Sequence, residues 1–485
     1  MRRSDLAVFV PDEIEINRLP ADAVTVPVIV ASRLADGMVT SLSVSAFEKT
    51  SETRAVLPLA ALSLSPEEVR AGLDAGDAET VAQVSKRVAY RHVALNVGGL
   101  PLENGSTSFV TVTVDAVLSG RRTREIVRLP LHVTTLPEVP GWYGGDGHVH
   151  TQWSPDVILL PLAQRARYAR DNGFDYVIIT DHEDGIGQRW GGPQGYCAQC
   201  RAAEDEYGIP VLPGVEIAAA GGGHCLAYYM RNETAVAVPS NRMFDPQTLL
   251  EQVRSHNRPM SYGIVAHPFE RREKWTNWSV GDFSGIEIIN RSRQSRPEAV
   301  AKWFELLRRD LPRTLRTGEF VVGLANSDCH NLQEPGGRGF TWIKPVSLGT
   351  GHDTSSKRAP LTRETVWKTL REGRAALSGS KDLGFFTLNG AGIGEIAHAH
   401  AGSTLSFTLE CHPSGGRRCR KITIFSGDGG QTVLRPGRPG TPVRLQARCP
   451  RTSTFYVARF DFASPGGRRP SEVWTNPVFV RVTDA

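Results

Sequence analysis

The sequence lacks the marks of several protein classes. No run of about 18 apolar residues, the length that a membrane-spanning helix needs, occurs in the 485-residue chain. The N-terminal segment MRRSDLAVFVPDEIEINRLP contains no sustained apolar stretch of the kind that a secretory signal requires. A net charge of +5 is dilute for this length, which argues against a nucleic-acid or membrane-surface partner. We therefore expect a cytoplasmic protein without membrane or nucleic-acid partners.

Cysteine is too sparse to form a disulfide framework. The chain has 7 cysteines, an odd number, and Cys197 and Cys200 form a CxxC without a second pair nearby. A single CxxC is weak evidence for structural zinc, so the sequence leaves open whether this pair binds a metal. Cys411, Cys419 and Cys449 are expected to be small buried apolar residues rather than bridges.

The two ends of the chain have the texture of β domains. In region 1–140, runs such as AVTVPVIVAS and FVTVTVDAVL predict a β-rich N-terminal domain. This region is interrupted at 65–89, where Ser65 as an N-cap and Pro66 at the first helical position predict a helical insert. Region 383–485 again contains strand-like runs between Gly- and Pro-rich turns, which predicts a second β-sandwich-like domain.

The central region, 141–382, alternates between strand-like and helix-like segments. Apolar runs such as FDYVIIT, YGIVAH and FVVGLANS suit buried strands, while PQTLLEQVRSHN and PEAVAKWFELLRRD have helical periodicity. This alternation predicts an α/β domain built on a largely parallel sheet or a barrel.

Six short segments of this region place His, Asp or Glu at the end of an apolar strand or just after it: GDGHVHTQWSPD, ITDH, PGVEI, GGGHC, VAHP and NSDCH. Because the carboxyl ends of parallel strands form one shared mouth, side chains from all six segments should converge. They supply six imidazoles and three carboxylates as candidate metal ligands, namely His148, His150, Asp156, His182, Glu216, His224, His267, Asp328 and His330.

This set of side chains predicts more than one metal ion. In His148-Val149-His150 and Asp328-Cys329-His330 the outer residues point the same way from an extended chain, so each pair could grip one ion. Imidazole mixed with carboxylate suits manganese, zinc or iron rather than calcium, and so many ligands exceed what one ion uses. We expect about two to three divalent transition-metal ions. One histidine after a strand is more often structural, but six such strand ends together have no structural purpose, since unpaired buried carboxylates and imidazoles are costly.

The same series resembles the polymerase and histidinol phosphatase (PHP) superfamily of metal-dependent hydrolases. HVHT with SPD, TDH, PGVE, a GH pair, HP and SDCH occur in the family's order over about residues 141–380. The flanking β domains and the late WTNPVFV are similar to the carbaryl-hydrolase-like (CehA/McbA) branch. The resemblance implies a distorted (β/α)7 barrel of the PHP type, with three metal ions and Glu216 as a bridging ligand. One residue more than the common spacing precedes Asp156.

Further residues are expected to act on the substrate. The expected catalytic residues are Glu216, Asp156, His224 and Asp181. Asp181, beside His182, is expected to orient an imidazole rather than bind metal. The segment after GIEIIN should lie at the mouth, where arginines could grip phosphate or carboxylate, and a tryptophan could contact an apolar leaving group. The expected substrate-binding residues are Arg291, Arg293, Arg296, Arg271 and Trp153.

These observations predict a metal-dependent hydrolase acting on a small molecule, an anionic or aromatic ester. The favoured reaction is phosphoester hydrolysis by a metal-bridging hydroxide at a di- or trinuclear centre. Three alternatives stay open: hydrolysis of a carbamate or carboxylic ester, iron-dependent redox chemistry at the same site, and a metal-free binding module. The sequence does not distinguish the metal, the natural substrate or the oligomeric state.

Overall fold

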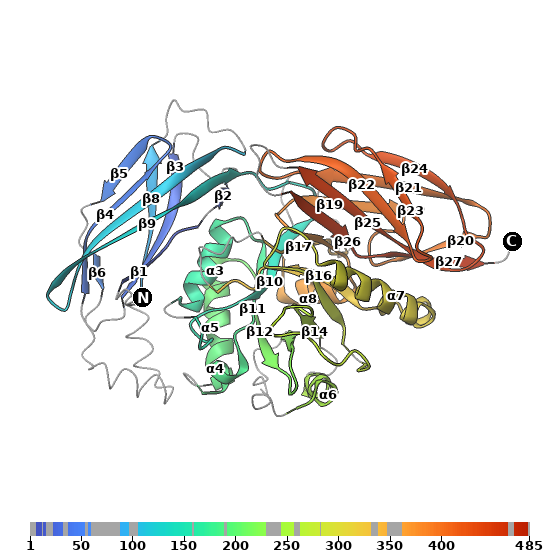
Figure 1. Ribbon diagram of the computed structural model, residues 1–485, viewed down its shortest axis with the longest axis horizontal. Helices are drawn as coiled ribbons and strands as arrows, with labels where there is room; N and C mark the ends of the chain where they lie inside the picture. Colours follow the sequence, from blue (N-terminus) through green and yellow to red (C-terminus); the bar gives the residue numbers. More distant parts are fainter. Residues whose placement is uncertain are drawn as a thin grey trace.

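The computed structural model describes three consecutive regions of the chain. In Figure 1 the N-terminal strands and the C-terminal strands lie on opposite sides, and an α/β region lies between and below them. No helix in the described part of the chain is long and apolar enough to cross a membrane. The described residues are 6–11, 13–15, 23–32, 37–53, 57–59, 88–96, 105–157, 160–188, 192–228, 244–256, 262–281, 283–330, 338–346, 361–463 and 470–483.

The N-terminal region consists of two sheets. One has the order β1-β3-β7, and the other has the order β2-β9-β8-β4-β5, with β6 on β4. Buried and half-buried residues alternate along β8, so one face of its sheet covers a core of valine and leucine side chains. The predicted helical insert 65–89 lies outside the described residues except for its last two, which begin β7. The strands are β1 (Leu6–Phe9), β2 (Glu13–Glu15), β3 (Ala23–Ser32), β4 (Gly37–Ala46), β5 (Lys49–Thr53), β6 (Leu57–Leu59), β7 (Val88–Asn96), β8 (Thr107–Leu118) and β9 (Arg121–Thr134).

The central region is a curved run of strands with helices between them. Its order is β16-β15-β14-β13-β12-β11-β10, and strands such as β11 are buried along their whole length, as their continuous apolar sequence requires. The strands are β10 (Tyr143–Val149), β11 (Tyr176–Ile179), β12 (Val211–Ala218), β13 (His224–Tyr228), β14 (Tyr262–Ala266), β15 (Gly285–Asn290) and β16 (Val322–Asn326). The helices are α3 (Leu162–Asp171), α4 (Glu183–Gln188), α5 (Gly192–Tyr207), α6 (Pro246–His256), α7 (Pro297–Thr317) and α8 (Arg363–Arg371).

A tight hairpin makes this sheet mixed rather than wholly parallel. Gly221, Gly222 and Gly223 all have positive φ and turn the chain directly from β12 into β13. As a result β13 pairs antiparallel with both β12 and β14, whereas β10, β11 and β12 are parallel, as are β14, β15 and β16. A Cβ on Gly223 would lie 2.8 Å from Trp275 Cα, so the turn also needs glycine for space.

The structure therefore does not confirm the expected (β/α)7 barrel. The ends of the run approach each other, because an isolated parallel bridge joins Val149, the last residue of β10, to Cys329 just beyond β16. The described residues show no ladder between β10 and β16 themselves. Instead the sheet continues from β10 through β17 (Phe340–Ile343) and β18 (Ala375–Ser378) into the C-terminal strands. What the structure shows is a mixed α/β fold with an extended sheet.

The C-terminal region places a three-stranded sheet against that extension. The smaller sheet has the order β19-β21-β24, and aromatic contacts such as Phe407 with Tyr456, 5.1 Å between ring centroids, join it to β25. The strands are β19 (Leu383–Leu388), β20 (Ile396–His400), β21 (Thr404–His412), β22 (Arg418–Ser426), β23 (Gln431–Leu434), β24 (Val443–Arg448), β25 (Thr454–Ala463), β26 (Ser471–Thr475) and β27 (Val478–Thr483).

Candidate metal centre

The candidate ligands gather at one end of the central strands. His148 is the residue before the last of β10, His182 follows β11, His267 follows β14 and Asp328 follows β16, so parallel strands deliver each of them to the same edge. The antiparallel β13 contributes His224 from its first residue, because its start lies at the edge where β12 ends. All nine predicted ligands converge here, and the remaining four are His150, Asp156, Glu216 and His330.

The ligand atoms form three overlapping groups. Within each group the ligand atoms lie no more than 4.8 Å apart. The first consists of His150, His182 and His330, the second of His148, His150, Glu216 and Asp328, and the third of Glu216, His224 and His267. Since the second group shares one residue with each of the others, the arrangement suits adjacent ions rather than separate sites.

Glu216 lies at the middle of the cluster, 1% exposed. Its Oε1 is 2.7 Å from His224 Nδ1 and 2.8 Å from His267 Nε2. Its Oε2 is 3.2 Å from Nε2 of both His148 and His150. One carboxylate oxygen therefore faces the third group and the other faces the second, which is the disposition that a bridging carboxylate requires.

Several buried polar atoms of the cluster lack a hydrogen-bond partner. They are Nε2 of His148, Nε2 of His150, Nδ1 of His267 and Oδ1 of Asp328. Leaving such atoms buried and unsatisfied costs about 1–3 kcal/mol each. Three of these atoms belong to the second group. Asp328 Oδ1 is 3.4 Å from His148 Nε2 and 3.2 Å from His150 Nε2. Buried donor atoms that converge without hydrogen-bond partners fit divalent metal ions.

The charges of the cluster perturb its own titration. Burial by itself lowers the pKa of His148, but the carboxylates of Asp328 and Glu216 hold this pKa well above its ordinary value. Burial also lowers the pKa of His182, but the carboxylates of Glu216 and Asp156 outweigh this effect and raise the pKa to about 10. Burial raises the pKa of Glu216, yet the surrounding imidazoles hold it well below the usual range. Without metal, protons balance the carboxylates, so metal ions must displace those protons.

The backbone at the mouth is strained. Three residues there, His267, Asp328 and Arg291, have φ values of 24°, 51° and 49°. Such conformations cost on the order of 1–3 kcal/mol each for residues other than glycine and persist where the surroundings enforce them. They turn the chain sharply at the ends of β14, β15 and β16 and aim these side chains at the cluster.

Buried residues that the sequence analysis missed hold the ligands in place. Glu287 Oε1 lies 3.0 Å from His148 Nδ1, and its Oε2 accepts a hydrogen bond of 2.8 Å from the His267 backbone N–H. With its proton on Nδ1, His148 presents an unprotonated Nε2 to the centre. Asp146, whose pKa burial raises to about 6, accepts hydrogen bonds from the backbone N–H groups of His148 and Ser327. A lone acid inside the apolar run GIEIIN was the available signal for Glu287.

Asp181 acts on the loop after β10. It accepts hydrogen bonds from Thr151 and from the Ser154 hydroxyl, at 2.6 and 2.8 Å. The same hydroxyl lies 2.9 Å from His150 Nδ1, so Asp181 reaches His150 through Ser154 rather than contacting it directly. Arg165, 2% exposed, donates to the carbonyls of His150 and Cys329 and so ties two ligand-bearing segments together.

Of the predicted substrate residues, Arg291 lies nearest the cluster. Its Nε is 3.0 Å from Asp328 Oδ2 and its Nη2 is 2.8 Å from His330 Nδ1, while half of the side chain remains exposed. Arg296 bonds to the Phe269 carbonyl and pairs with Glu270.

The other predicted substrate residues are placed differently. Arg271 is exposed on the loop after β14, and Arg293 accepts a hydrogen bond through its carbonyl from the backbone N–H of Glu472. Trp153 is fully buried, with its Nε1 donating to Gln199 and its ring edge-on to Tyr196, so its ring does not face solvent.

The cysteine pair lies apart from the ligand groups. Cys197 and Cys200 are both buried in α5, and burial raises the pKa of both thiols. Among the residues that the structure describes, no group of candidate metal ligands includes either of them.

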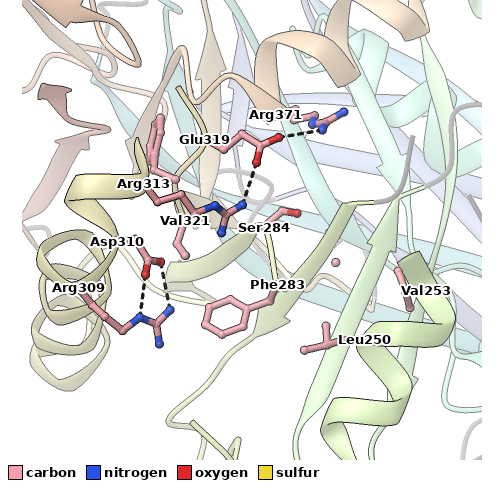
Figure 2. Close-up of a pocket in the computed structure, with 12 residues that line it drawn as sticks. Leu250, Val253, Phe283, Ser284, Arg309, Asp310, Arg313, Glu319, Val321 and Arg371 are labelled. Carbon is pink, nitrogen blue, oxygen red and sulfur yellow. Dashed lines mark hydrogen bonds and ion pairs between the residues drawn. The ribbon is translucent and has the colours of Figure 1, made fainter. Parts of the chain in front are cut away.

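A pocket at the opposite, amino-terminal end of the strands is a second charged region (Figure 2). Its arginines are neutralised locally, because Glu319 pairs with Arg313 at 2.8 Å and with Arg371 at 3.4 Å, and Arg309 pairs with Asp310 at 2.8 Å. The charges of this pocket are therefore balanced by one another.

No protein-family model and no curated protein matches the sequence. Among solved structures, a two-domain protein from Bacteroides vulgatus containing a predicted PHP-like metal-dependent phosphoesterase aligns with 16% identity, over 68% of this chain and 93% of that one, with a TM-score of 0.38. PsfC from Pseudomonas syringae aligns with 14% identity, over 48% and 90% of the two chains, with a TM-score of 0.34. At these scores neither likeness carries an argument about this protein.

Proposed function

We propose that the chain is a metal-dependent hydrolase of the PHP type whose preferred substrates are phosphoesters. The observation that carries the proposal is the set of three overlapping ligand groups, in which Glu216 and His150 are shared and buried lone pairs converge without partners. The motif series of the sequence supports the same superfamily. Divalent ions held in these groups would supply Lewis-acid stabilisation of developing negative charge and would lower the pKa of an attacking water.

The residues of the chain have separable tasks in this scheme. Glu287 and Ser154 hold His148 and His150 in the tautomers that leave Nε2 available. Glu216 keeps the second and third groups at a fixed separation through its two oxygens. Asp156, 47% exposed and 2.9 Å from His330 Nε2, lies on the open side, where its carboxylate can add a ligand to the group of His150, His182 and His330.

A phosphoester is favoured over a neutral ester because of Arg291. Its half-exposed guanidinium lies beside Asp328 and His330, at the open edge of the ligand groups. A guanidinium in that place can bind non-bridging phosphate oxygens bidentately, whereas an uncharged carbamate or aryl ester gains little from it. The aromatic wall that would favour an aryl ester lacks support from Trp153, which is buried.

The test is metal analysis of protein purified without chelator, followed by turnover assays on a panel of phosphoesters, aryl carbamates and carboxylic esters. We expect about two to three ions per chain and the highest kcat/KM on a phosphoester. Preference for neutral carbamates would favour the carbaryl-hydrolase-like activity instead. Turnover that depends on iron and dioxygen would favour redox chemistry, and a folded protein that binds no metal would favour a binding module.

A further inference from the structure

The loop between β15 and α7, residues 291–296, connects the metal centre to the C-terminal β region. At its start, Arg291 contacts Asp328 and His330. At its end, Arg296 bonds to the Phe269 carbonyl and Glu270, on the segment that follows His267. The position of this loop therefore decides where the Arg291 guanidinium lies relative to the ligands.

Glu472, on β26 of the C-terminal region, holds the middle of this loop. Its carboxylate accepts a hydrogen bond from the Ser295 backbone N–H, and its own backbone N–H donates to the Arg293 carbonyl at 3.2 Å. Glu472 is only 7% exposed, so both bonds are shielded from competing water. A side-chain bond and a backbone bond from one residue restrain two positions of the loop.

We call the two hydrogen bonds from Glu472 to the loop the clamp. Residues on either side of Glu472 in space and in sequence hold it in place. Gly379 donates its N–H to the Glu472 carbonyl at 2.9 Å, and a Cβ on Gly379 would lie 2.1 Å from the Arg293 carbonyl oxygen. Glycine at this position therefore lets the loop approach the sheet. The residue before Glu472, Ser471, donates to the buried Asp382 at 2.6 Å, which anchors the start of β26.

We propose that Glu472 is a positioning residue for hydrolysis: through Ser295 and Arg293 it holds loop 291–296 so that Arg291 can bind the anionic group of a substrate. The C-terminal β region then contributes to the active site, although it supplies none of the candidate ligands. This inference rests on the proposed phosphoester hydrolysis for its kinetic consequence. Its structural content, the clamp on the loop, holds whichever bond the enzyme cleaves.

The first experiment needs no substrate. Hydrogen–deuterium exchange of the full chain should show faster exchange of peptides covering 291–296 in Glu472→Ala than in the wild type, because the Ser295 amide loses its acceptor. Glu472→Gln should exchange like the wild type, since the amide oxygen can accept the same bond. Glu410→Ala, which removes a half-exposed carboxylate elsewhere in the C-terminal region, is the control and should leave this loop unchanged. Unchanged exchange in a folded Glu472→Ala overturns the proposal.

The second experiment asks whether the clamp acts through Arg291. Glu472→Ala should raise KM for a phosphoester at least about fivefold while changing kcat less, and Glu472→Gln should restore it. The double variant Glu472→Ala with Arg291→Ala should be no worse than Arg291→Ala alone, because the two residues serve one interaction. Additive losses would overturn the coupling. If Glu472→Ala does not fold, Glu472→Asp withdraws the carboxylate by one methylene and serves both experiments.

The two failures can be told apart. If the wild type does not cleave phosphoesters, the kinetic arm fails together with the proposed function, but faster exchange in the loop still supports the clamp. If phosphoesters are good substrates and the exchange does not change, the clamp is wrong while the proposed function stands.

Discussion

Replacing Glu216 by Gln removes one negative charge from the middle of the candidate metal centre. The side chain belongs to two of the three ligand groups, and its oxygens lie 2.7–3.2 Å from nitrogens of His148, His150, His224 and His267. A neutral amide has nearly the same size, so packing is preserved. An amide cannot bridge two cations, and its NH₂ group turns a donor toward imidazole nitrogens or metal ions.

The size of the effect follows from this placement. Only the group formed by His150, His182 and His330 keeps all its ligands, so the metal content should fall from about three ions to about one. Loss of the ions that stabilise negative charge should lower kcat by on the order of 10³-fold, which corresponds to about 4 kcal/mol. The melting temperature of the chelated protein should change much less than that of the metal-loaded protein, because the amide retains the packing.

The measurements are metal content by mass spectrometry of the native protein, kcat on the best substrate, and thermal melting with and without chelator. Glu319→Gln makes the same chemical change in the pocket at the opposite end of the strands (Figure 2), and it should leave metal content and kcat unchanged. If Glu216→Gln retains near-full activity with its full complement of metal, the shared-ligand reasoning is refuted.

Four further outcomes are expected. Protein purified without chelator should hold about two to three transition-metal ions, and saturation at one ion in a folded protein would disprove a polynuclear centre. Carboxylates hold the pKa of His148 high and raise that of His182 to about 10, so metal must displace protons and the apparent affinity for metal should weaken as pH falls. Calorimetry in buffers of different ionisation enthalpy should detect the released protons, and a pH-independent affinity would contradict this expectation. Changing Cys197 and Cys200 together to Ser should leave metal content and turnover nearly unchanged, and loss of an ion would assign them a ligand role. Arg291→Ala should cost roughly 1.5–3 kcal/mol in kcat/KM on phosphoesters and little on neutral aryl esters, whereas Arg313→Ala in the opposite pocket should change neither; equal losses on both substrate classes would argue against phosphate binding by Arg291.

Most of the candidate ligands could be predicted from the sequence because they stand near the end of an apolar strand or just after it. A strand end is a local feature, and the rule that parallel strands end at one edge needs no knowledge of the exact fold. The same rule explains why the arginines after GIEIIN were expected at the mouth, where Arg291 lies.

The shape of the sheet was harder to predict. The sequence predicted a largely parallel sheet or a barrel, but the three glycines before His224 make a hairpin and reverse the direction of β13. Whether the strands close into a barrel depends on twist and on pairing between β10 and β16, which lie far apart in the sequence.

The sequence by itself therefore determined which chemistry this protein can support: the imidazoles and carboxylates, their order, and their positions at strand ends. Only the tertiary structure decided how they are used. It showed that Glu216 lies between two ligand groups, that Glu287 and Asp181 with Ser154 orient His148 and His150, and that Glu472 reaches the arginine loop from 177 residues away along the chain. Contacts between segments far apart in the chain leave no periodic pattern in the sequence. They depend on distances between segments, which are set when the sheets pack against one another.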